Sequence, residues 1–178
     1  MGPFRILGAP SETRKCLFTS MNEIIAVTGN TNIAAIRQLF EEYSASLTID
    51  LTLQHIDDEM DSLPGVYTAP RGALFLAQVD GAPAGCIGLR PFSDSVGELK
   101  RLYVVPAFRG RGLARALILA GITAGRNAGY RSLVLDTLDS MHAAISLYES
   151  SGFRRTEPYW SNPFPNVLYF RLSLEPAR

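Results

Sequence analysis

Apolar residues recur along the chain with periods that divide residues 23–174 into strands and helices. Short β-rich runs bounded by glycine, proline or aspartate predict strands, and apolar residues three and four apart predict helices. The expected strands are EIIAVTG (23–29), GALFLAQV (72–79), APAGCIGLRPF (82–92), GELKRLYVV (97–105), SLVLDT (132–137) and two short runs near 153–158 and 167–174. The expected helices are 33–47, a short helix within 51–63, 112–128 and 141–153.

This order of elements predicts a fold of the α/β (α+β) class. Two consecutive strands joined by Asp80–Gly81 form a hairpin signal, whereas the strands on either side of 112–128 require a helical crossover. The chain therefore predicts a mixed, mostly antiparallel central sheet of about seven strands with flanking helices. We expect a single domain over 23–178, preceded by a weakly ordered leader over 1–22.

The strand at 97–105 carries an irregular spacing of apolar residues. Leu102 and Val104 are two apart and share a face, but Leu99 stands three before Leu102. Burying all three residues on one face requires one extra residue, which predicts a β-bulge around Lys100–Arg101. A bulge separates neighbouring strands and exposes backbone groups within the sheet, which suits an extended ligand.

Composition and charge exclude several classes of function. Seventeen basic residues balance seventeen acidic ones, so the overall charge does not favour nucleic acid or an anionic membrane. Cys16 and Cys86 form no CxxC pair, and the two histidines have no metal-like neighbours, so we expect no disulfide and no metal. No apolar run reaches the ~18 residues of a membrane span. These features predict a cytoplasmic protein.

The stretch LYVVPAFRGRGLARALILAG, residues 102–121, joins the bulged strand to the longest helix. Gly110 and Gly112 admit a ligand close to the backbone, and a helix beginning there presents free N–H groups. Together with Arg109, Arg111 and Arg115 they predict an anion site suited to a pyrophosphate. Neither the P-loop pattern nor the GxGxxG dinucleotide pattern fits the stretch.

LKRLYVVPAFRGRGLARAL resembles the acyl-CoA signature of the GNAT superfamily of N-acetyltransferases, whose loop reads Gln/Arg-x-x-Gly-x-Gly/Ala. The chain supplies Ala107 through Gly112 and departs from that pattern at Ala107. HAAISLYESSGF resembles a later family helix with an AxxLYxxxGF ending. The expected element order is also similar to that of the family from residue 23 to 174.

The resemblance implies an acetyl-CoA site, with acetyl-CoA as acyl donor, and two catalytic residues. Glu98 stands where several family members place a general base, and Tyr148 where many place the acid that protonates the leaving CoA thiolate. The backbone after the bulge would bind the pantetheine arm and the developing oxyanion, and the glycine–arginine loop would bind the pyrophosphate. The implied cofactor-binding residues are Leu102, Tyr103, Val104, Val105, Arg109, Gly110, Arg111, Gly112, Leu113, Ala114 and Arg115.

Structural alternatives exist for each candidate residue. Glu98 could be an exposed strand carboxylate paired with Lys100 or Arg101, and Tyr148 a half-buried aromatic. Asp136 is a reserve candidate for the base. So is His142, which also reads as a solvated residue in the first turn of its helix. Aromatic residues of the first helices and of the last inter-strand loop are either acceptor-pocket residues or core; they are Tyr43, Tyr67, Tyr159, Trp160 and Phe164.

The predicted function is acetyl transfer from acetyl-CoA to a primary amine of a small or amino-acid-like molecule, by direct attack in a ternary complex. A protein lysine or N-terminal amine is the alternative acceptor. A non-catalytic acyl-CoA-binding module and a nucleic-acid contact at the basic turn are the alternatives from other classes. A homodimer is common in the family, although no residue pattern identifies its interface.

Overall fold

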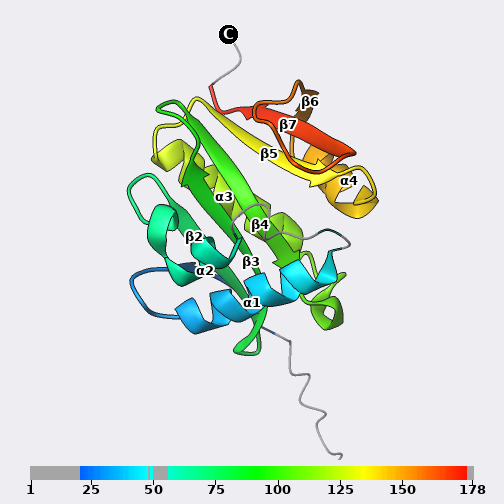
Figure 1. The fold of residues 1–178 in the computed structure, drawn as a ribbon. Helices are drawn as coiled ribbons and strands as arrows, with labels where there is room; N and C mark the ends of the chain where they lie inside the picture. Colours follow the sequence, from blue (N-terminus) through cyan, green and yellow to red (C-terminus); the bar gives the residue numbers. More distant parts are fainter. Residues whose placement is uncertain (1–20, 48, 50–55, 176–178) are drawn as a thin grey trace, which may run out of the picture.

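The structure, a computed structural model, is built on one mixed sheet and describes residues 21–47, 49 and 56–175. Figure 1 shows the sheet and its helices. The seven strands lie in the order β1-β2-β3-β4-β5-β7-β6. They are β1 Asn22–Val27, β2 Ala73–Val79, β3 Ala82–Pro91, β4 Val96–Val104, β5 Ser132–Leu138, β6 Arg154–Thr156 and β7 Val167–Ser173. The helices are α1 Ile33–Ser46, α2 Ile56–Asp61, α3 Leu113–Asn127 and α4 His142–Ser150, with short 3₁₀ helices η2 Gly65–Tyr67 and η3 Pro106–Phe108.

The pairing of the strands follows the predicted connections. β4 and β5 are parallel because α3 crosses between them, and every other neighbouring pair is antiparallel. Asp80 and Gly81 turn the β2–β3 hairpin with φ of 51° and 81°, and Gly152 ends α4 with φ of 96°. The predicted fold class and element order are confirmed. The predicted leader up to residue 20 and the first residues of the helix expected within 51–63 lie outside the described residues.

Helices cover both faces of the sheet, with α1 and α2 on one face and α3 and α4 on the other (Figure 1). Successive side chains of β3 pack into the two apolar layers on opposite faces of the sheet. Cys86 packs with Phe40 of α1, whereas Ile87 packs with Leu117 of α3. The two apolar layers hold the central strands rigidly, since each buried large side chain contributes about 1.5–3 kcal/mol.

The predicted bulge lies in the middle of β4. The register with β3 pairs Gly88 with Lys100 and Cys86 with Tyr103, so β4 contains one more residue than β3 over this span. Arg101 adopts a left-handed φ of 59° at the extra position. Leu99 and Leu102 therefore both pack against the layer that contains α3, as the apolar spacing requires.

Just before this bulge β4 and β5 separate. Their ladder runs only from Val96↔Ser132 to Glu98↔Val134, whereas β5 stays paired with β7 through Leu138. The residues of β4 after Glu98 consequently leave one edge without a strand partner. This opening in mid-sheet is where the candidate site lies.

Candidate active site

A cavity of about 500 Å³ lies between the end of β4 and the beginnings of α3 and α4. Nine of the eleven residues predicted for cofactor binding line it: Leu102, Tyr103, Val104, Arg109, Gly110, Gly112, Leu113, Ala114 and Arg115. The other two, Val105 and Arg111, are not among its lining residues. The N–H of Val105 instead donates to the carbonyl of Ala84 at 2.9 Å.

One wall of this first cavity is the N-terminus of α3. Gly110 and Gly112 have φ of 77° and 78°, and Gly112 is the N-cap without a side-chain capping bond. The first N–H groups of the helix therefore point outward with the positive end of its dipole. Arg109 and Arg115 are exposed beside them and line the same cavity. The arrangement fits a diphosphate.

A second cavity of about 50 Å³ lies where β4 and β5 separate. It shares Tyr43, Leu102 and Met141 with the first cavity. Its polar wall contains Lys100 and Asp136, and its other lining residues include Tyr148, Asn162 and Phe164. The two cavities are therefore adjacent.

Tyr148 is buried on α4, and its ring lies against those of Phe153 and Phe170 at centroid distances of 6.2 and 6.0 Å. Its hydroxyl has no hydrogen-bond partner among the described residues. Every fully enclosed polar side-chain atom in this part of the chain does have a partner, so the Tyr148 hydroxyl is not fully enclosed. The hydroxyl is thus open to the second cavity. Burial, with smaller contributions from Tyr43 and Asp136, raises the pKa of Tyr148 well above its ordinary value.

Glu98 is buried on β4, with 1% of its surface exposed, so the alternative of an exposed strand carboxylate is wrong. Arg90 of β3 donates to Oε2 through both Nε and Nη2 at 2.7 Å. Tyr159 donates its hydroxyl to Oε1 at 3.1 Å. Glu98 is not among the described residues that line either cavity.

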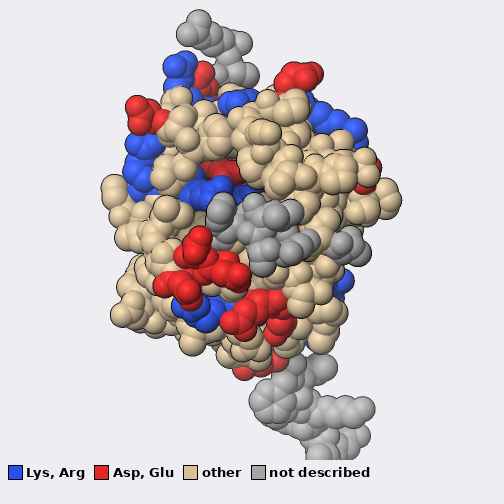
Figure 2. All heavy atoms as spheres, viewed as in Figure 1, with Lys and Arg blue, Asp and Glu red and all other residues tan. Residues whose placement is uncertain are grey.

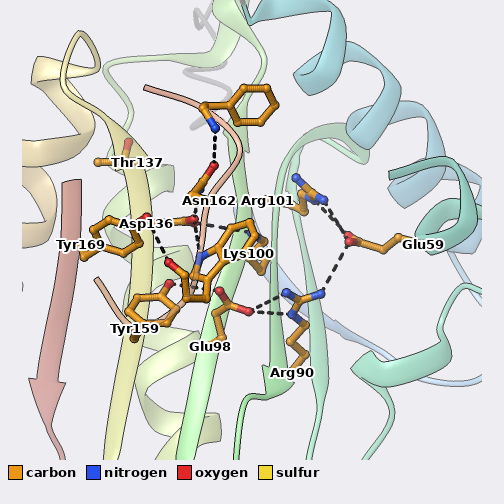
Figure 3. A network of polar contacts seen from close by, with 12 residues as sticks. Glu59, Arg90, Glu98, Lys100, Arg101, Asp136, Thr137, Tyr159, Asn162 and Tyr169 are labelled. Atoms are coloured by element: carbon orange, nitrogen blue, oxygen red, sulfur yellow. Dashed lines mark hydrogen bonds and ion pairs between the residues drawn. The ribbon is translucent and has the colours of Figure 1, made fainter. Parts of the chain in front are cut away.

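Asp136 is the part of the second cavity's polar wall that lies on β5. Trp160 and Asn162, from the loop between β6 and β7, donate to its Oδ2 at 3.1 and 2.8 Å. Lys100 of β4 approaches Oδ1 at 3.5 Å, and its ammonium lies 5.7 Å from the centre of the Trp160 ring. Figure 3 shows these contacts together with those of Glu98. The loop is thus attached to both strands through their carboxylates.

Glu59 of α2 completes the network on its other side (Figure 3). Arg101 donates Nε and Nη2 to the two carboxylate oxygens at 3.0 Å, and Tyr67 donates its hydroxyl at 2.7 Å. Burial opposes ionisation of Glu59, but these hydrogen bonds and the arginine charges hold its pKa below its ordinary value. Figure 2 shows basic and acidic atoms together in the hollow at the centre of this face.

This geometry agrees with the comparison to protein families. The model of the acetyltransferase (GNAT) family matches residues 31–153, which include the α3 loop and the α4 helix. The chain belongs to the GNAT acetyltransferase family. It is an acetyl-CoA-dependent N-acetyltransferase, and its seven-stranded sheet is the GNAT fold.

Two curated GNAT relatives and one solved structure illustrate the likeness. An uncharacterized N-acetyltransferase of Schizosaccharomyces pombe is 41% identical over 140 residues, covering 78% of this chain and 86% of the relative. An aminoglycoside N(6')-acetyltransferase type 1 of Stenotrophomonas maltophilia is 33% identical, covering 68% and 80%. A GNAT family acetyltransferase from Elizabethkingia anophelis with acetyl-CoA bound has a TM-score of 0.63 at 24% identity, covering 86% and 98%.

The glycine–arginine pattern predicted the loop, and the GNAT resemblance pointed to Tyr148, but sequence reasoning missed the polar network around them. Of the aromatic candidates, Tyr43 and Phe164 line the second cavity, whereas Tyr67 packs in the core beside Glu59. Arg90 and Glu59 carried no sequence signal, because each acts through side chains of another element: Arg90 binds Glu98 of β4, and Glu59 binds Arg101 of β4. His142 is exposed at the start of α4 and lines neither cavity.

Two further features of the described residues concern metal binding and membrane insertion. No group of three or more histidine, cysteine or acidic residues in this part of the chain is arranged to hold a metal ion. None of its helices has the length and apolar content needed to cross a membrane. Cys86 is buried, and burial raises the pKa of its thiol well above the ordinary value.

Proposed function

We propose that this acetyltransferase transfers the acetyl group of acetyl-CoA directly to a primary amine of a small molecule in a ternary complex. The carrying observation is that the two cavities meet at Tyr43, Leu102 and Met141. An acyl group at this junction faces the unpaired edge of β4 on one side and the second cavity on the other. An amine in the second cavity can then attack without a covalent acyl-enzyme.

The first cavity would hold the CoA moiety. The N–H groups at the start of α3 would bind the pyrophosphate, with Arg109 and Arg115 adding charge-assisted contacts. The β4 backbone at Leu102 and Tyr103 would bind the pantetheine arm as an added strand, with one of these amides facing the developing oxyanion. Positioning both substrates in this way supplies several kcal/mol of the rate enhancement.

Proton transfer would require an acid and a base. Tyr148 would protonate the leaving thiolate, since its hydroxyl opens into the second cavity and its raised pKa keeps it protonated. Two carboxylates are the candidates to accept the amine proton, namely Glu98 on β4 and Asp136 on β5. A general base of this kind contributes typically about 10²–10⁴ in rate.

A compact acceptor fits the second cavity best. The cavity is small, about 50 Å³, and Trp160 and Asn162 attach its loop wall to Asp136. A fixed wall leaves little space for a polypeptide segment. The relative from Stenotrophomonas maltophilia is named for an aminoglycoside, which is a small-molecule acceptor. Protein lysine and N-terminal amines are the competing acceptors.

Two measurements test this function together. Acetyl-CoA is titrated by calorimetry into the wild type and into a Gly110→Asp/Gly112→Asp variant, in which two carboxylates oppose the phosphates. Gly129→Asp is the matched control, because Gly129 also has a positive φ (79°) and open space around it but lies beyond the C-terminus of α3. We expect micromolar-range binding in the wild type and the control, and its loss in the double variant.

A thiol-release assay then compares small amines, lysine peptides and peptides with free N-termini. Turnover that is stimulated by small amines and not by the peptides supports the proposed acceptor class. Turnover confined to peptides would overturn the small-molecule assignment. Loss of acetyl-CoA binding in the Gly129→Asp control as well would show that backbone strain, and not the phosphate site, is responsible.

A further inference from the structure

Asp136 is the only carboxylate among the described residues that line the second cavity. Its two oxygens are in different situations. Oδ2 accepts hydrogen bonds from Trp160 and Asn162, whereas Oδ1 has only the longer 3.5 Å contact with Lys100. A carboxylate oxygen has about two lone-pair sites, so Oδ1 keeps capacity for a proton from a ligand.

Glu98 differs in its surroundings, because it lines neither cavity. Both of its oxygens already accept close hydrogen bonds, from Arg90 and from Tyr159, and it is almost fully enclosed. It can reach an amine in the second cavity only through another group. We propose that Oδ1 of Asp136 is the proton acceptor for the amine, and that Glu98 is a positioning residue. This inference rests on the proposed function.

The reaction then balances with groups of this chain. The neutral amine nitrogen attacks the thioester carbonyl carbon, and the new N–C bond makes the nitrogen cationic. Oδ1 of Asp136 accepts one proton from that nitrogen. The C–S bond breaks with its electron pair going to sulfur, and the Tyr148 hydroxyl donates its proton to the thiolate. Transfer of a proton from Asp136 to the tyrosinate restores both groups.

Lys100 has a defined part in this arrangement. Its ammonium lies beside Oδ1 and over the Trp160 ring, with 6% of the side chain exposed. A fixed positive charge disfavours a second ammonium nearby, so Lys100 favours binding of the acceptor as the neutral, nucleophilic amine. Arg101 of β4 lines the same cavity as Asp136. Tyrosines from α1, α4, the β6–β7 loop and β7 also interact with Asp136: Tyr43, Tyr148, Tyr159 and Tyr169.

The test compares Asp136→Asn with Glu98→Gln in the full chain, using an amine that the panel identifies. We expect kcat to fall about 10²–10⁴-fold in D136N while the Kd for acetyl-CoA stays within about twofold. In the pH profile of kcat/KM, corrected for the fraction of acceptor that is neutral, the wild-type enzyme should lose activity toward acid pH. This decrease should be absent in D136N. E98Q should retain the decrease and lose mainly stability, because it breaks a buried ion pair.

Chemical rescue provides a second test that does not depend on one amide variant. Asp136→Ala leaves space for formate, which should raise its turnover several-fold, whereas formate should leave Glu98→Ala unchanged. The assignment of the base to Asp136 would be overturned if D136N kept more than a tenth of the wild-type kcat, or if formate rescued Glu98→Ala instead. Either result would leave the proposed function itself intact. Absence of turnover with every amine and peptide in wild type would overturn the proposed function, and this assignment with it.

Discussion

Tyr148 shows how the environment of one residue decides its chemistry. Its ring is enclosed by the apolar side chains of Phe153 and Phe170, and its hydroxyl opens into the second cavity. Because burial penalises the tyrosinate, the hydroxyl keeps its proton until a strong acceptor forms next to it. A CoA thiolate at the junction of the two cavities would be such an acceptor.

The variant Tyr148→Phe should therefore lower kcat by about 10²-fold and leave acetyl-CoA affinity unchanged. The measurement is thiol release at saturating substrates, with calorimetry for binding. Tyr130→Phe is the matched control, since Tyr130 is also buried and its hydroxyl donates to the carbonyl of Arg71, away from both cavities. Equal kcat values for the two variants would remove Tyr148 from the reaction.

At the scale of elements, β4 and α2 depend on one another through a single buried ion pair. Arg101 has a left-handed φ at the bulge, which is unfavourable for a residue with a Cβ. The bidentate contact with Glu59 compensates for that conformation and attaches α2 to the sheet. The bulge lies directly after the last β4–β5 pair, Glu98↔Val134, so this ion pair holds the part of β4 that borders the site.

Glu59→Gln should lower the free energy of unfolding by about 3 kcal/mol, because it leaves the Arg101 charge buried without its partner. Asp61→Asn is the control on the same helix. Its ion pair with Arg37 is exposed, so we expect a change within about 1 kcal/mol. Urea unfolding of both variants measures the difference, and similar midpoints would contradict a special role of Glu59.

The same pair predicts acid sensitivity. The pKa of Glu59 is lower in the folded state than its ordinary value of 4.5, so the ionised carboxylate stabilises the fold above about pH 4.5. This contribution is lost as the pH falls through the lower folded pKa. Between pH 6 and pH 3, the wild type should therefore lose more stability than Glu59→Gln. Parallel losses in the two proteins would assign the acid sensitivity to other carboxylates.

At the scale of the whole molecule, the fold buries Tyr67 and Tyr148 and partly buries Tyr43 and Tyr159. Burial raises the pKa of Tyr43 to about 12, and it raises those of Tyr67, Tyr148 and Tyr159 further above the ordinary 10.0. The unfolded chain ionises these hydroxyls first, so folded stability is retained below pH 10 and lost as the pH rises above it.

The unfolding midpoint in urea should accordingly fall between pH 9 and pH 11. Tyrosinate absorbance should increase together with the loss of ellipticity, because the folded protein keeps these hydroxyls protonated at a pH where the unfolded chain ionises them. Tyr43→Phe should reduce the alkaline loss of stability. A full tyrosinate signal at pH 11 from a protein that is still folded would show that these hydroxyls are accessible.

Local sequence patterns predicted the elements, the hairpin turn at Asp80–Gly81 and the bulge at Lys100–Arg101. These features depend on residues that are close together in the chain, where the spacing of apolar side chains and the tolerance of glycine for positive φ are decisive. The loop from Arg109 to Gly112 was predictable for the same reason. Its two positive-φ glycines and the start of α3 belong to one strand–helix connection.

Only the tertiary structure decided which carboxylate meets the cavity. Glu98 and Asp136 lie on adjacent strands, but Glu98 is bound by Arg90 and Tyr159 and lines neither cavity, whereas Asp136 lines the cavity where β4 and β5 separate. Those partners stand 8 and 61 residues from Glu98, and Asn162 stands 26 residues from Asp136. The spacing of residues along the chain determines strands, helices and turns. The burial of a carboxylate and its hydrogen-bond partners depend on which other segments pack next to it in the fold.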